Sequence, residues 1–190
     1  LNLALFQSDY SDIQIVVNEG IAPKVRNGGE GRIKGFEIEG QAAPTDWLRI
    51  DYGVGYLDAG YRTVDPSAFP VTVDSKFAFV PEWTGTVAAN ATAFDNESGK
   101  LVIRGDWYHQ SGTFKDAVNS PQLYQPAYSV FGANASYTIP GDQITITAGV
   151  TNLTDERYIQ GGYVDLDVGG VALATYSRPR EWFLKIGYEY

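Results

Sequence analysis

The sequence predicts an all-β fold, an antiparallel up-and-down transmembrane β-barrel of about eight strands. The final segment is the clearest sign, because Trp182, Leu184, Ile186, Tyr188 and Tyr190 alternate with other residues and share one face of a strand. Aromatic residues at both ends of such an apolar stripe are typical of a strand that crosses an outer membrane. The same period of two recurs along almost the whole chain, and short connections alternate with long ones.

Composition is compatible with one domain of this kind, residues 1–190. The chain has 13 Tyr and 21 Gly, no Cys and no Met, and 19% charged residues. Without Cys there is no disulfide framework and no thiolate metal site, and no apolar run approaches the roughly 20 residues of a membrane helix. The chain starts at Leu1 within an alternating segment, so we expect a fragment or a processed product. A net charge of −9 without a basic cluster argues against a nucleic-acid partner.

Eight segments follow the strand period and are separated by turn-forming residues. The predicted strands, with residues that set the alternation where it is clearest, are 1–17 (Leu1, Leu3, Leu5), 32–43 (Phe36, Ile38), 47–62 (Leu48, Ile50, Tyr52, Val54, Tyr56), 77–94 (rich in small residues), 101–113 (Leu101, Ile103, Trp107), 128–139, 143–152 and 177–190.

The connections are sorted by length. Three short ones read as tight turns: 44–46, 95–100 and 140–142. Between them lie four long links: 18–31, 63–76, 114–127 and 156–176. Strict alternation predicts tight turns on one side and long loops on the other, as in an outer-membrane barrel. A soluble sandwich mixes hairpins with Greek-key crossovers and has no reason to sort loops by side.

The alternation also assigns two faces to the sheet. The residues predicted to face lipid are Phe36, Ile38, Leu48, Ile50, Tyr52, Val54, Leu101, Ile103, Trp107, Ile144, Ile146, Ala148, Leu184 and Ile186. Those predicted to face the lumen are Glu37, Glu39, Arg49, Asp51, Arg104, Asp106, Thr145, Thr147 and Lys185. The reason is that Arg or Lys on the lipid face costs about 2–4 kcal/mol at the midplane.

Residues that could carry chemistry are few, so we expect no enzyme and no cofactor. His109 is the only histidine and is interpreted as a strand or rim residue. The acidic loop from Asp165 to Asp167 has oxygens that could ligate calcium, but solvated loop acids are the favoured interpretation. Glu37 and Glu39 share a strand face near Arg49, which favours a polar lattice inside a barrel over a catalytic pair.

Aromatic residues in the long loops carry the best binding signal. Phe69, Tyr124 and Tyr163 are the candidates for contact with a ligand at the external mouth of a barrel. The alternative for loop aromatics is an outer girdle at the membrane interface, which needs no ligand. For Tyr128, Tyr158 and Tyr176, which lie at strand ends, the girdle is favoured.

Two stretches near the C-terminus form a recognisable pattern. Residues 148–158 read Ala-Gly-Val-Thr-Asn-Leu-Thr-Asp-Glu-Arg-Tyr, and residues 176–190 read Tyr-Ser-Arg-Pro-Arg-Glu-Trp-Phe-Leu-Lys-Ile-Gly-Tyr-Glu-Tyr. Upstream, residues 33–39 read Ile-Lys-Gly-Phe-Glu-Ile-Glu. On these residues the chain resembles the C-terminal barrel portion of TonB-dependent outer-membrane receptors, over essentially its whole length. The terminal motif is the more specific part of this resemblance.

The resemblance implies a receptor for scarce nutrients of the ferric siderophore, cobalamin or glycan type, in the outer membrane of a Gram-negative bacterium. Implied partners are outer-membrane lipid, the remaining barrel and plug of the same receptor, the TonB complex through an N-terminal part absent here, and the barrel assembly machinery. In outer-membrane barrels a final strand ending in an aromatic is read by that machinery, which implies an assembly signal at Leu184, Ile186, Tyr188 and Tyr190.

The chain departs from the family in having nothing that resembles the plug or the TonB box. Receptors of this family have about 22 strands, so eight strands are roughly a third of a barrel. An isolated arc in lipid leaves unpaired backbone groups that cost several kcal/mol each. Either the chain is a piece of a larger barrel, or its eight strands close on themselves. The alternatives are a complete small barrel with a structural or adhesion role, a soluble aromatic-rich β-sandwich that binds carbohydrate, and a barrel hydrolase, which the single His109 disfavours.

Overall fold

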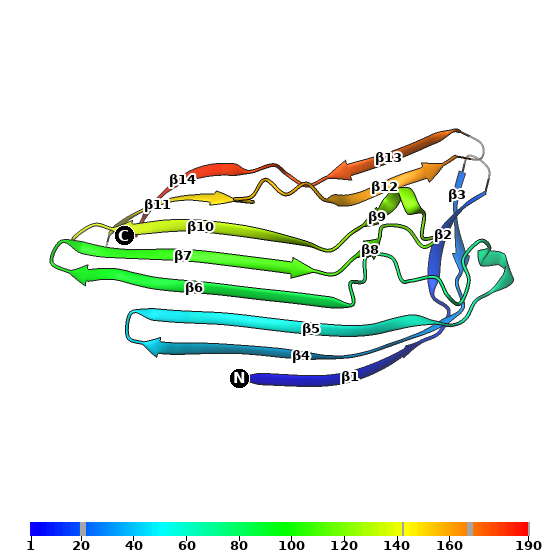
Figure 1. The fold of residues 1–190 in the computed structure, drawn as a ribbon, viewed down its shortest axis with the longest axis horizontal. Helices are drawn as coiled ribbons and strands as arrows, with labels where there is room; N and C mark the ends of the chain where they lie inside the picture. Colours follow the sequence, from blue (N-terminus) through cyan, green and yellow to red (C-terminus); the bar gives the residue numbers. More distant parts are fainter. Residues whose placement is uncertain (20–21, 142, 167–168, 190) are drawn as a thin grey trace.

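The computed structural model describes residues 1–19, 22–141, 143–166 and 169–189. Its main feature is one antiparallel sheet of eight strands, here called the wall, in which each strand pairs with its sequential neighbours along the wall (Figure 1). In order, the wall strands are β1 (Asn2–Tyr10), β4 (Glu30–Thr45), β5 (Leu48–Thr63), β6 (Trp83–Asn96), β7 (Gly99–Gln110), β10 (Tyr128–Thr138), β11 (Ile144–Thr151) and β14 (Glu181–Tyr188). The topology predicted from connection lengths is confirmed.

The tight turns gather at one end of the wall, the turn end, and the long links gather at the other, the loop end (Figure 1). The β6–β7 turn shows how tightly the turn end is built. Gly99 has φ +107°, and a Cβ there would lie 2.4 Å from the carbonyl oxygen of Thr138 on β10. Position 99 therefore requires glycine for two reasons: the positive φ, and the Thr138 carbonyl oxygen that leaves no room for a Cβ. The Tyr137 hydroxyl donates to the Ser98 carbonyl at 2.6 Å and closes the same corner.

Strand boundaries at the loop end were predicted too long. The first strand ends at Tyr10 rather than residue 17, because Asp12 has φ +55° and accepts a 2.8 Å hydrogen bond from Asn27 Nδ2. The chain then turns into a separate hairpin, β2 (Gln14–Glu19) with β3 (Ala22–Asn27), which crosses the loop end of the wall (Figure 1). The segment from 77 was predicted as strand, but β6 begins only at Trp83.

The links predicted as plain loops contain structure of their own. Besides β2 and β3, these elements are the short helices η1 (Pro66–Ala68) and η2 (Pro121–Leu123), the short pair β8 (Thr113–Phe114) and β9 (Tyr124–Gln125), and the hairpin β12 (Ile159–Asp165) with β13 (Val171–Tyr176). Backbone groups away from water need partners, and these pairings supply them. The last wall strand begins at Glu181 rather than 177, since Pro179 has no N–H for the ladder.

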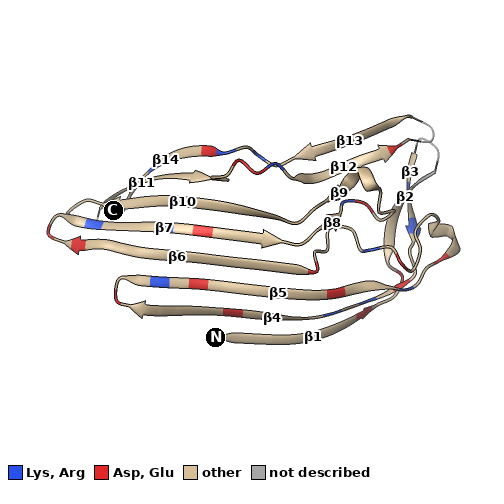
Figure 2. Ribbon diagram, viewed as in Figure 1, with Lys and Arg blue, Asp and Glu red and all other residues tan. Residues whose placement is uncertain are grey.

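The register separates the two predicted faces as expected. On one face Ile103 of β7 lies between Ala91 and Ala135, and on the other Arg104 lies between Asn90 and Asn134. Every residue predicted to face lipid falls on the first, here called the outer face. Every residue predicted to face the lumen falls on the second, the inner face. In Figure 2 charged positions recur along β5 and β7, whereas β10 has none.

Aromatic residues of the outer face gather toward both ends of the wall. Toward the loop end, Phe36, Tyr56 and Trp83 pack with ring centroids 4.7–5.9 Å apart. Toward the turn end, Phe94 lies edge-on to Tyr137 at 6.3 Å. On β14 the corresponding residues are Trp182 and Tyr188, separated by about 20 Å of strand. Two aromatic rows around an apolar band are typical of a membrane-spanning wall.

The largest buried cluster lies among the loops. Ile15 and Val17 of β2, Tyr61 of β5, and Ala68 and Val71 of the β5–β6 link are each at most 9% exposed, and together they form what we call the loop core. Tyr61 lies on the inner face, and Phe77, packed against this cluster, comes within 2.4 Å of where a Cβ on Gly31 would sit. The loops therefore fold over the inner side of the wall rather than outward.

The wall is an open sheet. β1 and β14 each pair with one neighbour among the described residues, and they do not pair with each other. Their outer-face side chains are the most solvent-accessible of the wall: Leu3 is 64% exposed and Leu184 is 69% exposed. Within the described part of the chain, no helix has the length and apolarity to cross a membrane.

Candidate functional site

A cavity of about 520 Å³ lies between the loops at the open end of the inner face. Four separate links build it: the segment leading into β2, the β5–β6 link, the β7–β10 link and β12. Most of its wall is apolar or aromatic, including Ile15, Phe77, Phe79, Leu123 and Val164. A concave, largely apolar space with few polar groups is the usual form of a small-molecule site. We call it the loop cavity.

Lys115 brings a positive charge to the loop cavity. The residue is 8% exposed, its Nζ donates to Thr113 Oγ1 at 2.8 Å, and the ammonium lies 5.4 Å from the centre of the Phe79 ring. Burial lowers the pKa of the Lys115 ammonium below its usual value. Among the described residues no carboxylate forms an ion pair with it. Within the described part of the chain, the cavity therefore holds a cation that no carboxylate pairs with.

The neighbouring acid, Asp116, is engaged elsewhere. Its Oδ1 accepts from the Ser120 backbone N–H at 2.9 Å, and its Oδ2 accepts from the Ser120 hydroxyl at 2.5 Å. These two bonds fix the turn that leads into η2. Asp116 therefore shapes the loop that presents Lys115.

The three aromatic residues predicted to face a ligand are not brought together. Tyr163 of β12 lines the loop cavity. Tyr124 packs on Phe114 at 4.9 Å and lines a separate cavity of about 340 Å³ with Lys76 and Glu82. Phe69 is 79% exposed and lines none of the cavities described here. Lys115 was not predicted as a site residue, because a lone lysine in a long loop has the sequence signature of an ordinary solvated charge.

The girdle interpretation of Tyr128 is wrong. Tyr128 falls on the inner face opposite Gln110, is 9% exposed, and stacks on Tyr158 with ring centroids 4.0 Å apart. Tyr176 of β13 lies under the Arg157 guanidinium at 4.0 Å. The Tyr128–Tyr158 stack joins the last long link to the wall, the Arg157–Tyr176 contact lies within that link, and the outer-face aromatic rows are formed by other residues.

A polar lattice crosses the inner face of the wall, as predicted near Arg49 and Asp51. Asp51 Oδ2 accepts from Arg49 at 3.4 Å and from Asn90 Nδ2 at 3.3 Å, and Asn90 Oδ1 accepts from Arg104 at 3.1 Å. The predicted place of Glu37 and Glu39 in this lattice is wrong: among the described residues neither bonds to it, because they lie opposite Gly55 and Gly53, which offer no side chain.

His109 is a wall-strand residue, in agreement with its interpretation as structural. It lies on the outer face of β7, its ring stacks on Trp107, and its Nδ1 is 3.0 Å from Ser129 Oγ.

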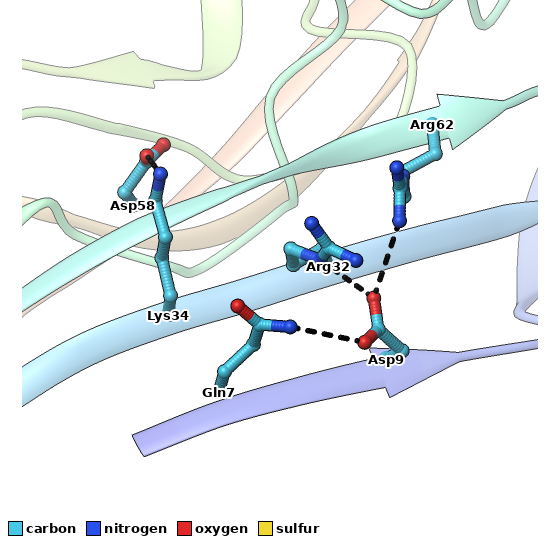
Figure 3. Close-up of polar contacts among 6 residues, drawn as sticks. All are labelled: Gln7, Asp9, Arg32, Lys34, Asp58 and Arg62. Atoms are coloured by element: carbon cyan, nitrogen blue, oxygen red, sulfur yellow. Dashed lines mark hydrogen bonds and ion pairs between the residues drawn. The ribbon is translucent and has the colours of Figure 1, made fainter. Parts of the chain in front are cut away.

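On β1, β4 and β5 the outer face changes from apolar to charged just beyond the loop-end aromatics. Arg32 Nε donates to Asp9 Oδ1 at 2.6 Å, and Arg62 lies 3.6 Å from the same oxygen (Figure 3). Lys34 pairs with Asp58 at 3.0 Å on the adjacent strands (Figure 3). Exposed pairs of this kind are screened by solvent and add little to stability. These ion pairs are informative because they show where the apolar band of the outer face ends.

The two C-terminal stretches that carry the resemblance meet in one junction. Asn152, 7% exposed and at φ +50°, donates from Nδ2 to the carbonyl oxygens of Glu156 and Arg178 at 2.9 and 3.1 Å. Its Oδ1 accepts from the Glu156 N–H at 2.8 Å. Asp155 Oδ1 in turn accepts from the Arg180 N–H at 2.7 Å. The end of β11 is thus tied to the start of β14 across the whole last link.

The remaining predicted site residues are only partly described. Leu184, Ile186 and Tyr188 lie on the outer face of β14, each more than 60% exposed, while Tyr190 lies outside the described residues. Asp165 is described and Asp167 is not. Across the described part of the chain, no cluster of three or more His, Cys, Asp or Glu side chains is arranged to hold a metal ion. A calcium site in this loop therefore stays untested.

The open antiparallel wall, with its two aromatic rows and a loop cavity at one end, defines the class: an arc of a membrane β-barrel with sorted turns and loops. A family model described as "TonB dependent receptor-like, beta-barrel" matches residues 1–153. The chain belongs to the TonB-dependent receptor family, in its β-barrel domain.

Solved structures share this fold over the whole chain. The ferric yersiniabactin uptake receptor FyuA from Yersinia pestis matches with a TM-score of 0.81 at 20% identity, covering 99% of this chain and 27% of that one. The siderophore receptor PiuA from Acinetobacter baumannii matches at 0.75 and 19% identity, covering 99% and 26%. The ferric-catecholate import receptor Fiu from E. coli K12 matches at 0.72 and 18%, covering 98% and 24%. The chain spans about a quarter of the length of these proteins.

Proposed function

We propose that this chain is part of an outer-membrane receptor that imports ferric siderophores with energy delivered through TonB. The chain supplies wall strands and the loops at the outer mouth, while a plug and further wall strands come from the rest of the same receptor. The observation that carries the proposal is the loop cavity, which lies over the inner face where cargo enters such a barrel. The outer face meets lipid, and the charged cluster of Figure 3 lies at its outer boundary.

Ferric siderophores are favoured over cobalamin and glycans, the other cargo classes that the family resemblance implies. Three solved structures that share the fold are receptors for ferric yersiniabactin, for a siderophore and for ferric catecholates. Aromatic walls and a buried cation suit a negatively charged metal chelate better than an uncharged glycan.

Uptake of labelled iron tests the proposal. The full-length receptor, expressed in a Gram-negative strain that lacks its own siderophore receptors, is expected to import ⁵⁵Fe with at least one chelator from a panel of catecholates, hydroxamates and citrate. Deletion of TonB in the same strain is expected to abolish this import. Import of labelled cobalamin or oligosaccharide without any import of iron would contradict the proposal.

We also propose that β14 acts as an assembly signal, because Leu184, Ile186 and Tyr188 form an apolar row on one face of a strand whose backbone edge is free before the barrel folds. A sheet edge on the assembly machinery can pair with that backbone while a groove binds the row of apolar side chains.

Tyr190→Ala in the full-length receptor is expected to reduce the folded, membrane-inserted fraction sharply, with precursor accumulating in the periplasm. Heat-modifiable gel mobility of outer-membrane fractions measures this, and normal insertion of the variant would disprove the role.

A further inference from the structure

The buried ammonium of Lys115 needs an explanation that the fold alone does not provide. A charge removed from water is costly unless an opposite charge or several hydrogen bonds compensate it. Lys115 has one hydroxyl acceptor, Thr113 Oγ1, and the face of one ring, Phe79. The nearest chain carboxylate that also lines the cavity, Asp116, is bonded to Ser120. Among the described residues, none therefore supplies a negative charge for Lys115.

The walls of the cavity indicate what should carry that charge. Phe77 and Phe79 of the β5–β6 link, Tyr163 of β12 and Tyr61 of β5 all line it, and the Phe79 ring faces the ammonium at 5.4 Å. Aromatic rings pack well in offset or edge-to-face contacts with other rings. Phe79 is held at φ +64°, and its N–H donates to the Phe114 carbonyl at 2.9 Å, which fixes the ring beside Lys115.

We propose that the loop cavity binds an aromatic ring bearing a negatively charged oxygen, with Lys115 as its counter-ion. This rests on the proposed function, because such a ring is one arm of a metal chelate presented at the outer mouth. The cavity, at about 520 Å³, has room for such a ring. Tyr163 contributes a wall, and Lys115 is the residue that selects for charge.

The test uses the purified full-length receptor and two ⁵⁵Fe probes in equilibrium dialysis: the anionic ferric complex of 2,3-dihydroxybenzoate and the neutral ferric complex of acetohydroxamate. We expect the wild-type receptor to bind the anionic probe more tightly than the neutral one. Lys115→Met is expected to weaken binding of the anionic probe at least tenfold and to leave the neutral probe unchanged. Lys115→Arg keeps the charge and should retain most of the affinity. The matched control is Lys100→Met at the turn end, which should bind as wild type does.

Stability without ligand separates this role from a structural one. If Lys115 lacks a counter-ion in the free receptor, Lys115→Met should unfold at the same or higher denaturant concentration than wild type. A clear loss of stability would mean that a carboxylate elsewhere in the full receptor already pairs with Lys115, and would overturn the proposal. Equal binding of the anionic probe by wild type and Lys115→Met, or no binding by wild type, would overturn it too. Binding that depends on Lys115 in a receptor that imports no iron would instead uphold the subsite and reject the proposed function.

Discussion

Asn152→Ala is expected to be among the most destabilising single changes in the wall. The substitution removes three hydrogen bonds made by a buried side chain and puts alanine at φ +50°. Lost buried hydrogen bonds cost about 1–3 kcal/mol together with the unsatisfied groups, and the left-handed conformation adds about 1–2 kcal/mol for a residue with a Cβ. We expect about 2–5 kcal/mol in all, measured by urea unfolding of the full-length receptor in lipid.

Two companion variants divide that loss into its causes. Asn152→Gly loses the same hydrogen bonds but accepts the positive φ, so it should be less destabilised than the alanine variant. Thr154→Ala changes an exposed neighbour in the same turn and should stay within about 0.5 kcal/mol of wild type. If Asn152→Ala unfolds as wild type does, the junction between β11 and β14 does not contribute to stability in the way its geometry implies.

Ile103→Arg is expected to impair insertion into the membrane, whereas Val102→Arg on the same strand is not. Ile103 lies on the outer face between two alanines and is 49% exposed. Val102 lies on the inner face, opposite Ser136 and Thr92. Arginine facing lipid near the midplane costs about 2–4 kcal/mol, while arginine on the polar side keeps its water. The difference between these adjacent positions is the direct test of which face meets lipid.

The measurement is the folded fraction of the full-length receptor in lipid vesicles, followed by heat-modifiable mobility and by urea midpoints. We expect the midpoint of Ile103→Arg to fall well below that of Val102→Arg. Equal midpoints would show that both faces of β7 contact the same environment. Ile146→Arg and Thr147→Arg on β11 repeat the comparison on a second strand, where the same two faces alternate.

The wall could be predicted from the sequence because its signal is local. Alternation of Ile103 with Arg104 or of Ile146 with Thr147 depends only on the strand period, so face and pairing order follow without knowledge of distant contacts. Connection lengths then decide which strands are neighbours. Errors in the wall are confined to strand ends. The ladder of β1 stops before Asp12 although the alternation continues beyond it, and the ladder of β14 starts after Pro179 although the alternation begins before it.

The site was harder to predict because it depends on contacts between links far apart in the chain. Ile15 and Val17 look like a continuation of the first strand, yet they are buried against Ala68 and Val71 some fifty residues later. Lys115 has no sequence neighbour that marks it as buried. Tyr128 was assigned to the membrane interface by its place at a strand end, and only its stacking on Tyr158 shows that it faces inward. Tertiary packing, rather than local pattern, decides these positions.

The loop core constrains how receptors of this kind can exchange parts. The hairpins β2–β3 and β12–β13 each pair their backbone within one link. Other hydrogen bonds join different links, such as the one from the Phe79 N–H to the Phe114 carbonyl and the one from the Lys76 N–H to Asn119 Oδ1. Side-chain packing joins the links too, because Ile15, Tyr61, Val71 and Ala117 come from four different stretches and bury one another. A graft of one link would leave a hole among the others. Natural recombination and engineered chimaeras should therefore keep the four links together as a block, the last hairpin included, because Gly162 of β12 packs closely on Leu123 of η2.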